Sequence, residues 1–355
     1  MNTNSFVICF DYLHIFSLKG QEDMILLKKD DKYMNKKIKN QELFPGGNEG
    51  FWKNVLKHID QITEIRIRVH NPIIIYHNHK EISLDKNGEL LYSVENGYSF
   101  DYIELQKLID FWCMDSRYAF QEEIKKGFIT IKGGHRIGIC GEVIYDAQGK
   151  IQTIKYISSI NIRIAHEIQG IANSLMRHIF LHEKIANTLI ISPPGMGKTT
   201  LLRDMIRLIS DGMGEWQGKN VAVIDERGEI AACYQGIWQL NVGKRTDVLY
   251  GCNKEVGMRM LLQSMAPQVI AMDELVTKKE RNLVQQLMGR GSAVIATMHG
   301  ENKIDNIRYQ KWYKGFQVII FLVRIEDVFH TQIYKYEEGK KCKKYWEQYL
   351  LSQDF

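Results

Sequence analysis

The chain has 355 residues, enough for two ordinary domains, and its 45% hydrophobic and 25% charged residues form a normal globular mixture. The net charge of +5 permits contact with nucleic acid or an anionic membrane but requires neither. None of the six cysteines falls in a Cys-x-x-Cys pair, which argues against a zinc site and indicates a reducing compartment. No apolar run approaches the roughly 20 residues of a membrane span, so we expect a soluble protein that meets a membrane only through partners.

Residues 1–40 are expected to be a poorly defined N-terminal extension. They contain the charge run "LLKKDDKYMNKKIKN", which is typical of a solvated segment. Met24 and Met34 are alternative start sites.

Residues 41–160 predict a smaller α+β N-terminal domain. In "ITEIRIRV" isoleucines alternate with charged residues, which predicts a half-buried strand. Residues 101–126 have helical spacing. The stretch "GFITIKGGHRIGICGEVIY" then predicts a hairpin that turns at Gly133 and Gly134.

Residues 161–330 have another rhythm, in which helical segments separate five short apolar runs: "NTLIIS", "NVAVIDER", "QVIAMDE", "SAVIATMHG" and "FQVIIFLVR". Runs this apolar suit strands buried on both faces, as in a parallel sheet covered by helices. The expected fold class is therefore α/β. Residues 331–355, with "KKCKKYW", are expected to be a solvated basic tail.

The stretch "SPPGMGKTT" matches a phosphate-binding loop, with Ser192 where the usual pattern has its first glycine. It follows an apolar run and precedes a helical pattern, which predicts a P-loop NTPase domain of the RecA/AAA-like type. Two glycines let backbone N–H groups approach phosphate, the lysine reaches the β- and γ-phosphates, and the first threonine binds Mg²⁺. The predicted ATP-binding residues are Pro194, Gly195, Met196, Gly197, Lys198, Thr199 and Thr200.

Two apolar runs end in acid pairs, Asp225-Glu226 and Asp273-Glu274. Ligands of such folds bind at this carboxyl edge of the sheet. We assign Asp273 to Mg²⁺, together with Thr199, and Glu274 as the base that polarises the attacking water. Asp225 and Glu226 are auxiliary acids in this prediction, and a surface carboxylate at the end of a strand is the alternative for each acid alone.

Thr297 and His299 follow at the end of another apolar run, "AVIATMHG". A polar pair there can sense the γ-phosphate. A structural histidine is the alternative.

The order of these motifs resembles that of secretion-type ATPases, whose later three motifs are called the Asp box, Walker B and His box. Within that superfamily the chain resembles most the stage III sporulation protein AA family of endospore-forming bacteria. The matching phrases are "GFITIKGGHRIGICGE", "ISSINIRIAHEI", "LIISPPGMGKTTLLRD", "VIDERGEIAACYQG", "VGKRTDVLYGC" and "ATMHG". Residues 1–33 find no counterpart, which supports Met34 as a start, and Asp225-Glu226 reverses the Glu-Asp order of the secretion Asp box.

This resemblance implies a cytoplasmic ATPase that is peripherally associated with the membrane proteins of the channel between mother cell and forespore. It also implies a homo-oligomer, a ring of six subunits. In secretion ATPases, arginines in strand contexts like those of Arg136 and Arg163 reach nucleotide phosphates, sometimes in a neighbouring subunit. Arg259 is a weaker candidate for that role, and for each arginine a surface cation is the alternative.

Three functions remain open at this point. The first is a ring-forming motor that energises or assembles the sporulation channel. The second is a nucleic-acid-stimulated ATPase, which is not favoured because the chain has no recognisable nucleic-acid module. The third is a nucleotide-gated scaffold that barely hydrolyses ATP.

Overall fold

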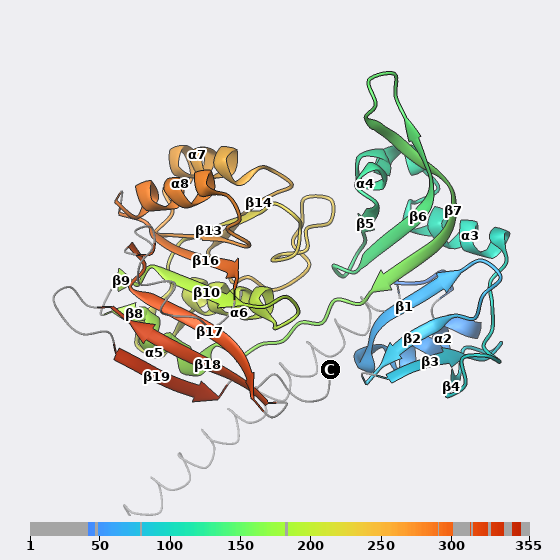
Figure 1. The fold of residues 1–355 in the computed structure, drawn as a ribbon, viewed down its shortest axis with the longest axis horizontal. Coiled ribbons are helices and arrows are strands. Elements are labelled where there is room, and N and C mark those ends of the chain that lie inside the picture. Colours follow the sequence, from blue (N-terminus) through green and yellow to red (C-terminus); the bar gives the residue numbers. More distant parts are fainter. Residues whose placement is uncertain are drawn as a thin grey trace, which may run out of the picture. The chain divides into compact units, whose positions relative to one another are not determined.

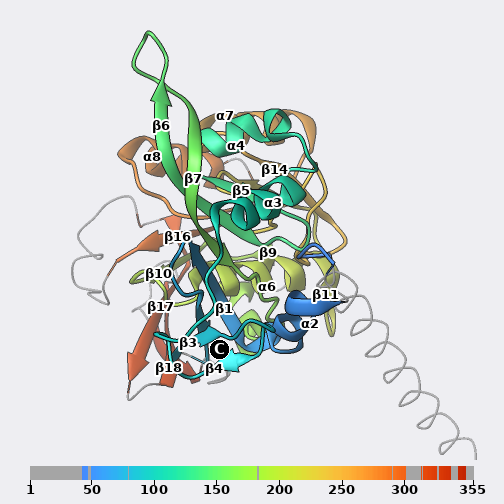
Figure 2. The same cartoon turned by 90° about the vertical axis from the view of Figure 1, so that its right-hand side faces the viewer.

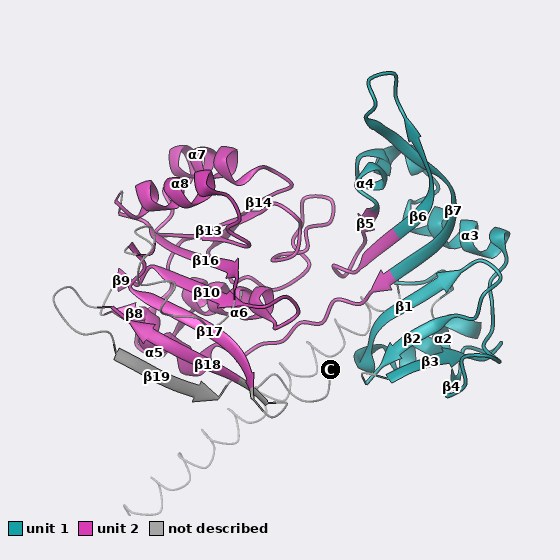
Figure 3. Cartoon of the chain, in the orientation of Figure 1, with its two compact units in different colours: residues 1–127, 139–161 teal, residues 128–138, 162–355 magenta. Residues whose placement is uncertain are grey.

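The computed structural model describes residues 42–46, 49–78, 80–181, 184–289, 291–300, 313, 315–325, 328–336 and 343–348. The expected extension 1–40 and the alternative starts Met24 and Met34 lie outside these residues. The chain divides into two compact units (Figure 3): the first is Met1–Gly127 with Ile139–Asn161, and the second is Phe128–Gly138 with Ile162–Phe355. Within the described residues, no helix is long and apolar enough to span a bilayer.

The first unit is built on a seven-stranded sheet of order β4-β3-β2-β1-β7-β6-β5, whose last strands continue into the second unit. Its aromatic core stacks Phe44 on Trp52, with ring centroids 3.8 Å apart. The elements in chain order are α2 (Gly50–Lys57), η1 (Ile59–Gln61), β1 (Ile62–Arg68), β2 (Ile74–His77), β3 (Lys80–Leu84), β4 (Leu90–Leu91), α3 (Tyr102–Trp112), η2 (Arg117–Phe120), α4 (Gln121–Lys125), β5 (Phe128–Thr130), β6 (Arg136–Tyr145) and β7 (Ile151–Arg163).

Two local predictions for this region are confirmed. The run "ITEIRIRV" forms β1, with Ile65 and Ile67 fully buried. The chain turns between the antiparallel strands β5 and β6 at Gly133 and Gly134, whose φ angles of 87° and 82° lie in the left-handed region that favours glycine. Figure 2 shows β6 and β7 as a long hairpin that projects from the other elements of the first unit.

The second unit contains an eight-stranded sheet of order β14-β13-β15-β16-β10-β17-β18-β19 (Figure 1). The six strands from β14 to β17 are parallel, and the last two are antiparallel. Its elements are α5 (Asn173–Ile179), β8 (Phe180–Leu181), β9 (Lys184–Ile185), β10 (Thr188–Ser192), α6 (Lys198–Asp211), β11 (Gly212–Met213), β12 (Trp216–Gln217), β13 (Val221–Asp225), β14 (Thr246–Tyr250), α7 (Lys254–Ser264), β15 (Val269–Met272), α8 (Lys278–Met288), β16 (Ala293–His299), β17 (Val318–Ile325), β18 (Val328–Lys335) and β19 (Lys343–Gln348).

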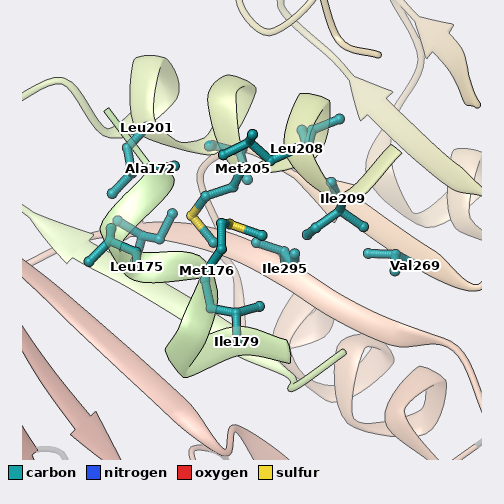
Figure 4. Close-up of a cluster of buried hydrophobic side chains, with 14 of the residues drawn as sticks. Ala172, Leu175, Met176, Ile179, Leu201, Met205, Leu208, Ile209, Val269 and Ile295 are labelled. Atoms are coloured by element: carbon teal, nitrogen blue, oxygen red, sulfur yellow. The ribbon is translucent and has the colours of Figure 1, made fainter. Parts of the chain in front are cut away.

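Each apolar run forms a strand because helices cover both faces of the sheet. In β13, Val221 and Val223 face the core that includes α5 and α6, which Figure 4 shows in part. Their neighbours Ala222 and Ile224 face a second core, which includes residues of α7 and α8. All four side chains are at most 1% exposed. The predicted α/β fold with a parallel sheet is confirmed.

The expected basic tail differs from the structure. Residues 328–335 and 343–348 form β18 and β19, which extend the sheet by antiparallel pairing. Thr331 and Ile333 are fully buried, so this stretch forms a strand with a buried face although many of its residues are polar. The boundary after Asn161 lies one residue beyond the predicted one. The second unit also takes in 128–138 of the expected N-terminal domain.

Candidate active site

The candidate residues meet where parallel strands end. Ser192, the last residue of β10, pairs in register with His299, the last residue of β16. β15 ends at Met272, directly before Asp273 and Glu274, and it pairs with the other side of β16. Because β16 lies between β10 and β15, the phosphate loop, the His299 segment and the acid pair share one edge of the sheet.

The loop after β10 has the backbone that phosphate binding needs. Gly195 and Gly197 have φ angles of 75° and 77°, in the left-handed region. A Cβ at Gly195 would meet nothing within 4 Å, so the backbone conformation alone requires glycine there. Gly197 caps the 14-residue helix α6, whose first N–H groups and dipole favour an anion. Met196 packs against the core, so its side chain anchors the loop.

Lys198 is only 6% exposed, at the start of α6. Its ammonium donates to the carbonyls of Ser192 (3.3 Å) and Pro193 (3.1 Å) and lies 3.0 Å from His299 Nδ1. Burial lowers the pKa of Lys198, and the charges of Asp273 and Glu274 oppose that shift. The buried ammonium is therefore held by two backbone carbonyls at the start of α6, beside the loop that would bind phosphate.

Asp273 accepts two hydroxyl hydrogen bonds. Thr199 Oγ1 donates to its Oδ2 at 2.5 Å, and the buried Thr297 hydroxyl donates to its Oδ1. Thr297 Oγ1 also accepts from the backbone N–H of Glu274 at 2.9 Å, and it thereby holds Glu274 at a φ of 50°, which is unusual for a residue with a side chain.

This donor set fits Mg²⁺. A carboxylate and a hydroxyl from the protein, completed by water and phosphate oxygens, form the usual environment of a nucleotide-bound magnesium ion. The described residues contain no cluster of three or more His, Cys, Asp or Glu side chains that could hold a metal by themselves. Asp273 and Thr199 would supply the protein ligands of a nucleotide-bound Mg²⁺.

Both carboxylate oxygens of Glu274 have cationic or ring partners. Oε1 lies 2.5 Å from His299 Nε2, and Oε2 lies 2.8 Å from Arg227 Nη1. Lys198, His299 and Glu274 thus form a continuous chain of contacts. The sequence prediction missed Arg227, although its position next to the Asp225-Glu226 pair at a strand end was the available signal.

The other acid pair has different partners. Asp225 is 2% exposed and accepts from the backbone N–H groups of Glu229, Ile230 and Ala231. Burial raises the pKa of Asp225, and these N–H donors oppose the shift. Glu226 pairs with the buried Lys254 of α7, at 2.5 Å.

The two predicted arginines also lie apart from the contacts of Lys198 described above. Arg136 forms an ion pair with Glu229 at 2.8 Å, and its guanidinium lies over the Phe128 ring, 3.5 Å from the centroid. Arg163 is exposed at the last position of β7. Thr200 lies in the first turn of α6, and Pro194 is exposed in the loop before it.

Comparison with known proteins finds one matching family and several related sequences. The family described as "Sporulation stage III, protein AA" matches residues 35–327. "Stage III sporulation protein AA" of Bacillus subtilis (strain 168) is 37% identical over 254 residues, which are 70% of this chain and 78% of that protein. "Protein SEEDLING PLASTID DEVELOPMENT 1" of Arabidopsis thaliana is 28% identical over 168 residues, 44% of this chain and 22% of that protein.

Two solved structures share the fold. The ATPase DotB of Legionella pneumophila has a TM-score of 0.50 at 14% identity, over 81% of each chain. The pilus retraction motor PilT, solved with bound ADP, has a TM-score of 0.52 at 14% identity, over 85% of this chain and 83% of that one. At this identity the likeness shows the fold alone. The resemblance and fold class predicted from the sequence are both confirmed.

Proposed function

Since the chain belongs to the sporulation stage III protein AA family, we propose that it is an ATPase, which hydrolyses Mg·ATP to ADP and phosphate. The observation that carries this proposal is the meeting of Lys198, Thr199, Asp273, Glu274 and His299 at one sheet edge, through the contacts described above.

The loop and Lys198 bind and orient the triphosphate. Backbone N–H groups of the loop and of the first turn of α6 point at the phosphates, and the ammonium of Lys198 moves from its carbonyl acceptors to phosphate oxygens. Asp273 and Thr199 would hold Mg²⁺, and the bound ion would supply positive charge to offset the charge that develops on the phosphates. Thr297 fixes the Asp273 carboxylate and the Glu274 backbone at once, so the metal site and the base keep one geometry.

Glu274 is the base for the attacking water. A carboxylate oxygen accepts the proton as the water oxygen attacks the γ-phosphorus and the bond to ADP breaks. His299 orients this carboxylate through Nε2, and its Nδ1 faces Lys198. Because His299 contacts both the lysine and the base, it is proposed to sense the γ-phosphate through them.

The proposal extends to the assembly. A homo-oligomeric ring of six subunits, acting from the cytoplasm on the membrane proteins of the channel between mother cell and forespore, is supported by family membership and by the shared fold with DotB and PilT. Because Arg163 is exposed, its guanidinium is suited to contact the nucleotide bound by a neighbouring subunit. Glu226, which pairs with Lys254, is an auxiliary acid in this proposal.

The test is steady-state turnover and nucleotide affinity of the purified full-length chain. Lys198→Ala should lose both productive binding and turnover. Glu274→Gln should retain Mg·ATP binding and lose turnover by about 10²–10⁴-fold, because an amide cannot accept the proton. Glu226→Gln is the matched control, since it makes the same change in the other acid pair. A larger loss in Glu226→Gln than in Glu274→Gln would refute the assignment, and wild-type turnover in Lys198→Ala would remove this site from consideration. Binding without measurable hydrolysis by the wild type would favour a scaffold.

A further inference from the structure

Among the described residues, Arg227 is the one cation beside the Glu274 carboxylate that the function proposed above leaves without a role. Its Nη1 lies 2.8 Å from Glu274 Oε2, and its side chain is 59% exposed. A solvent-exposed ion pair of this kind contributes little to folding stability. The same contact nevertheless sets the orientation of the proposed base, because it engages the oxygen that His299 does not.

The segment that carries Arg227, residues 225–231, is firmly anchored, and we call it the Asp225 loop. Asp225 accepts three backbone N–H groups from the far end of the segment, those of Glu229, Ile230 and Ala231. The buried Arg203 of α6 donates to the carbonyls of Glu229 (2.7 Å) and Ile230 (2.5 Å). Both ends of the loop are thus tied to the sheet or to α6, and Arg227 projects from a rigid support.

A third anchor comes from the turn between β5 and β6. Arg136 Nη1 pairs with Glu229 Oε1 at 2.8 Å. Within the turn, the Gly133 N–H donates to Gln239 Oε1 at 2.9 Å. This hydrogen bond holds the turn against the stretch that follows the Asp225 loop. Arg136 therefore touches the loop, and the loop touches Glu274, within the second unit.

We propose that Arg227 is a positioning residue for Glu274, and that Arg136 acts on the same carboxylate indirectly, through Glu229 and the Asp225 loop. The inference rests on the ATPase function proposed above and deepens it. It assigns to Arg136 a role that differs from that of an arginine finger. A finger contacts phosphate and has no need of Glu229, whereas a loop anchor works only while Glu229 is present.

The experiment compares Arg227→Ala, Arg136→Ala, Glu229→Ala and the double variant Arg136→Ala/Arg227→Ala. Arg66→Ala is the matched control, because it removes an arginine from another 2.8 Å ion pair, in the first unit. Turnover, affinity for a fluorescent ATP analogue and the thermal midpoint are measured for the full-length chain, and Lys198→Ala marks the background of turnover.

We expect kcat of Arg227→Ala to fall about 10–100-fold with little change in KM or analogue affinity, as follows from a misplaced catalytic group. Arg227→Lys should recover part of the lost turnover, because it restores a cation beside Glu274. Arg136→Ala and Glu229→Ala should match each other, at about 3–10-fold, and the double variant should be no slower than Arg227→Ala, since residues that act through one path are not additive.

Several outcomes overturn the inference. One is a severe loss in Arg136→Ala with normal turnover in Glu229→Ala, since Arg136 would then act on the nucleotide. A second is a double variant whose fold-loss in turnover equals the product of the two single losses. A third is unchanged or faster turnover in Arg227→Ala. If the wild type shows no turnover above the Lys198→Ala background, the ATPase proposal itself fails. If the wild type turns over and Arg227→Ala matches it, only the positioning role fails.

Discussion

Replacing Thr297 by valine tests how the site is held together. The hydroxyl of this fully buried residue donates to Asp273 Oδ1 and accepts from the Glu274 N–H. Valine has nearly the same shape but can make neither hydrogen bond. The substitution therefore removes a side chain that contacts both acids, without opening a cavity.

The cost follows from these contacts. Losing a hydrogen bond to a charged carboxylate costs about 1.5–3 kcal/mol. The Glu274 N–H keeps a second acceptor, Asp273 Oδ1 at 3.0 Å, so its loss adds only about 0.5–1 kcal/mol. The new buried methyl group returns about 0.8 kcal/mol. The net destabilisation is about 1–3 kcal/mol, which lowers the thermal midpoint of a domain of this size by roughly 2–12 °C.

Turnover distinguishes the lost hydroxyl from a packing defect. Thr297→Val should lose about 10–100-fold in turnover and require more Mg²⁺, because Asp273 and Glu274 lose their shared support. Thr297→Ser loses a buried methyl group, at about 1 kcal/mol, but keeps the hydroxyl and should keep most of the turnover and the Mg²⁺ dependence. Equal turnover in the valine and serine variants would refute the reasoning.

Three further predictions concern single groups of the site. Asp273→Asn should raise the Mg²⁺ concentration needed for half-maximal turnover about tenfold or more, as seen in a magnesium titration, and an unchanged titration curve would place the metal elsewhere. Arg163→Ala and Glu274→Gln, each nearly inactive alone, should partly restore turnover when mixed, because each supplies what the other lacks; equal inactivity after confirmed subunit exchange would mean that Arg163 serves its own chain or no nucleotide. Burial lowers the pKa of Lys198 below its usual 10.5, so between these two pH values the unfolded chain binds more protons than the folded one. The free energy of unfolding of the wild type, relative to that of Lys198→Met, should therefore rise with pH in this window. Urea unfolding at several pH values measures this difference, and a constant or falling difference would contradict the prediction.

Local sequence patterns predicted the main strands and the edge of the sheet where the candidate residues lie. Five apolar runs form strands because a run of consecutive apolar residues can be fully buried only in a strand covered by helices on both faces of the sheet. The stretch "SPPGMGKTT" predicted a turn because its two glycines adopt positive φ. These are short-range properties, which neighbouring residues specify. The prediction of a solvated tail after residue 330 was wrong, because many residues there are polar and β18 buries only part of its side chains.

Which strand lies beside β10, and which side chains contact each acid, depended on long-range packing. Local sequence patterns do not specify strand order, which depends on how the helices pack on both faces of the sheet and how the chain crosses between strands. Because β16 lies between β10 and β15, Thr297 and His299 reach Asp273 and Glu274. The two acid pairs look alike in sequence, yet one is bound by its own loop and by Lys254 while the other meets Thr199, His299 and Arg227. Such contacts join residues up to 101 positions apart, so they exist only once the chain has folded.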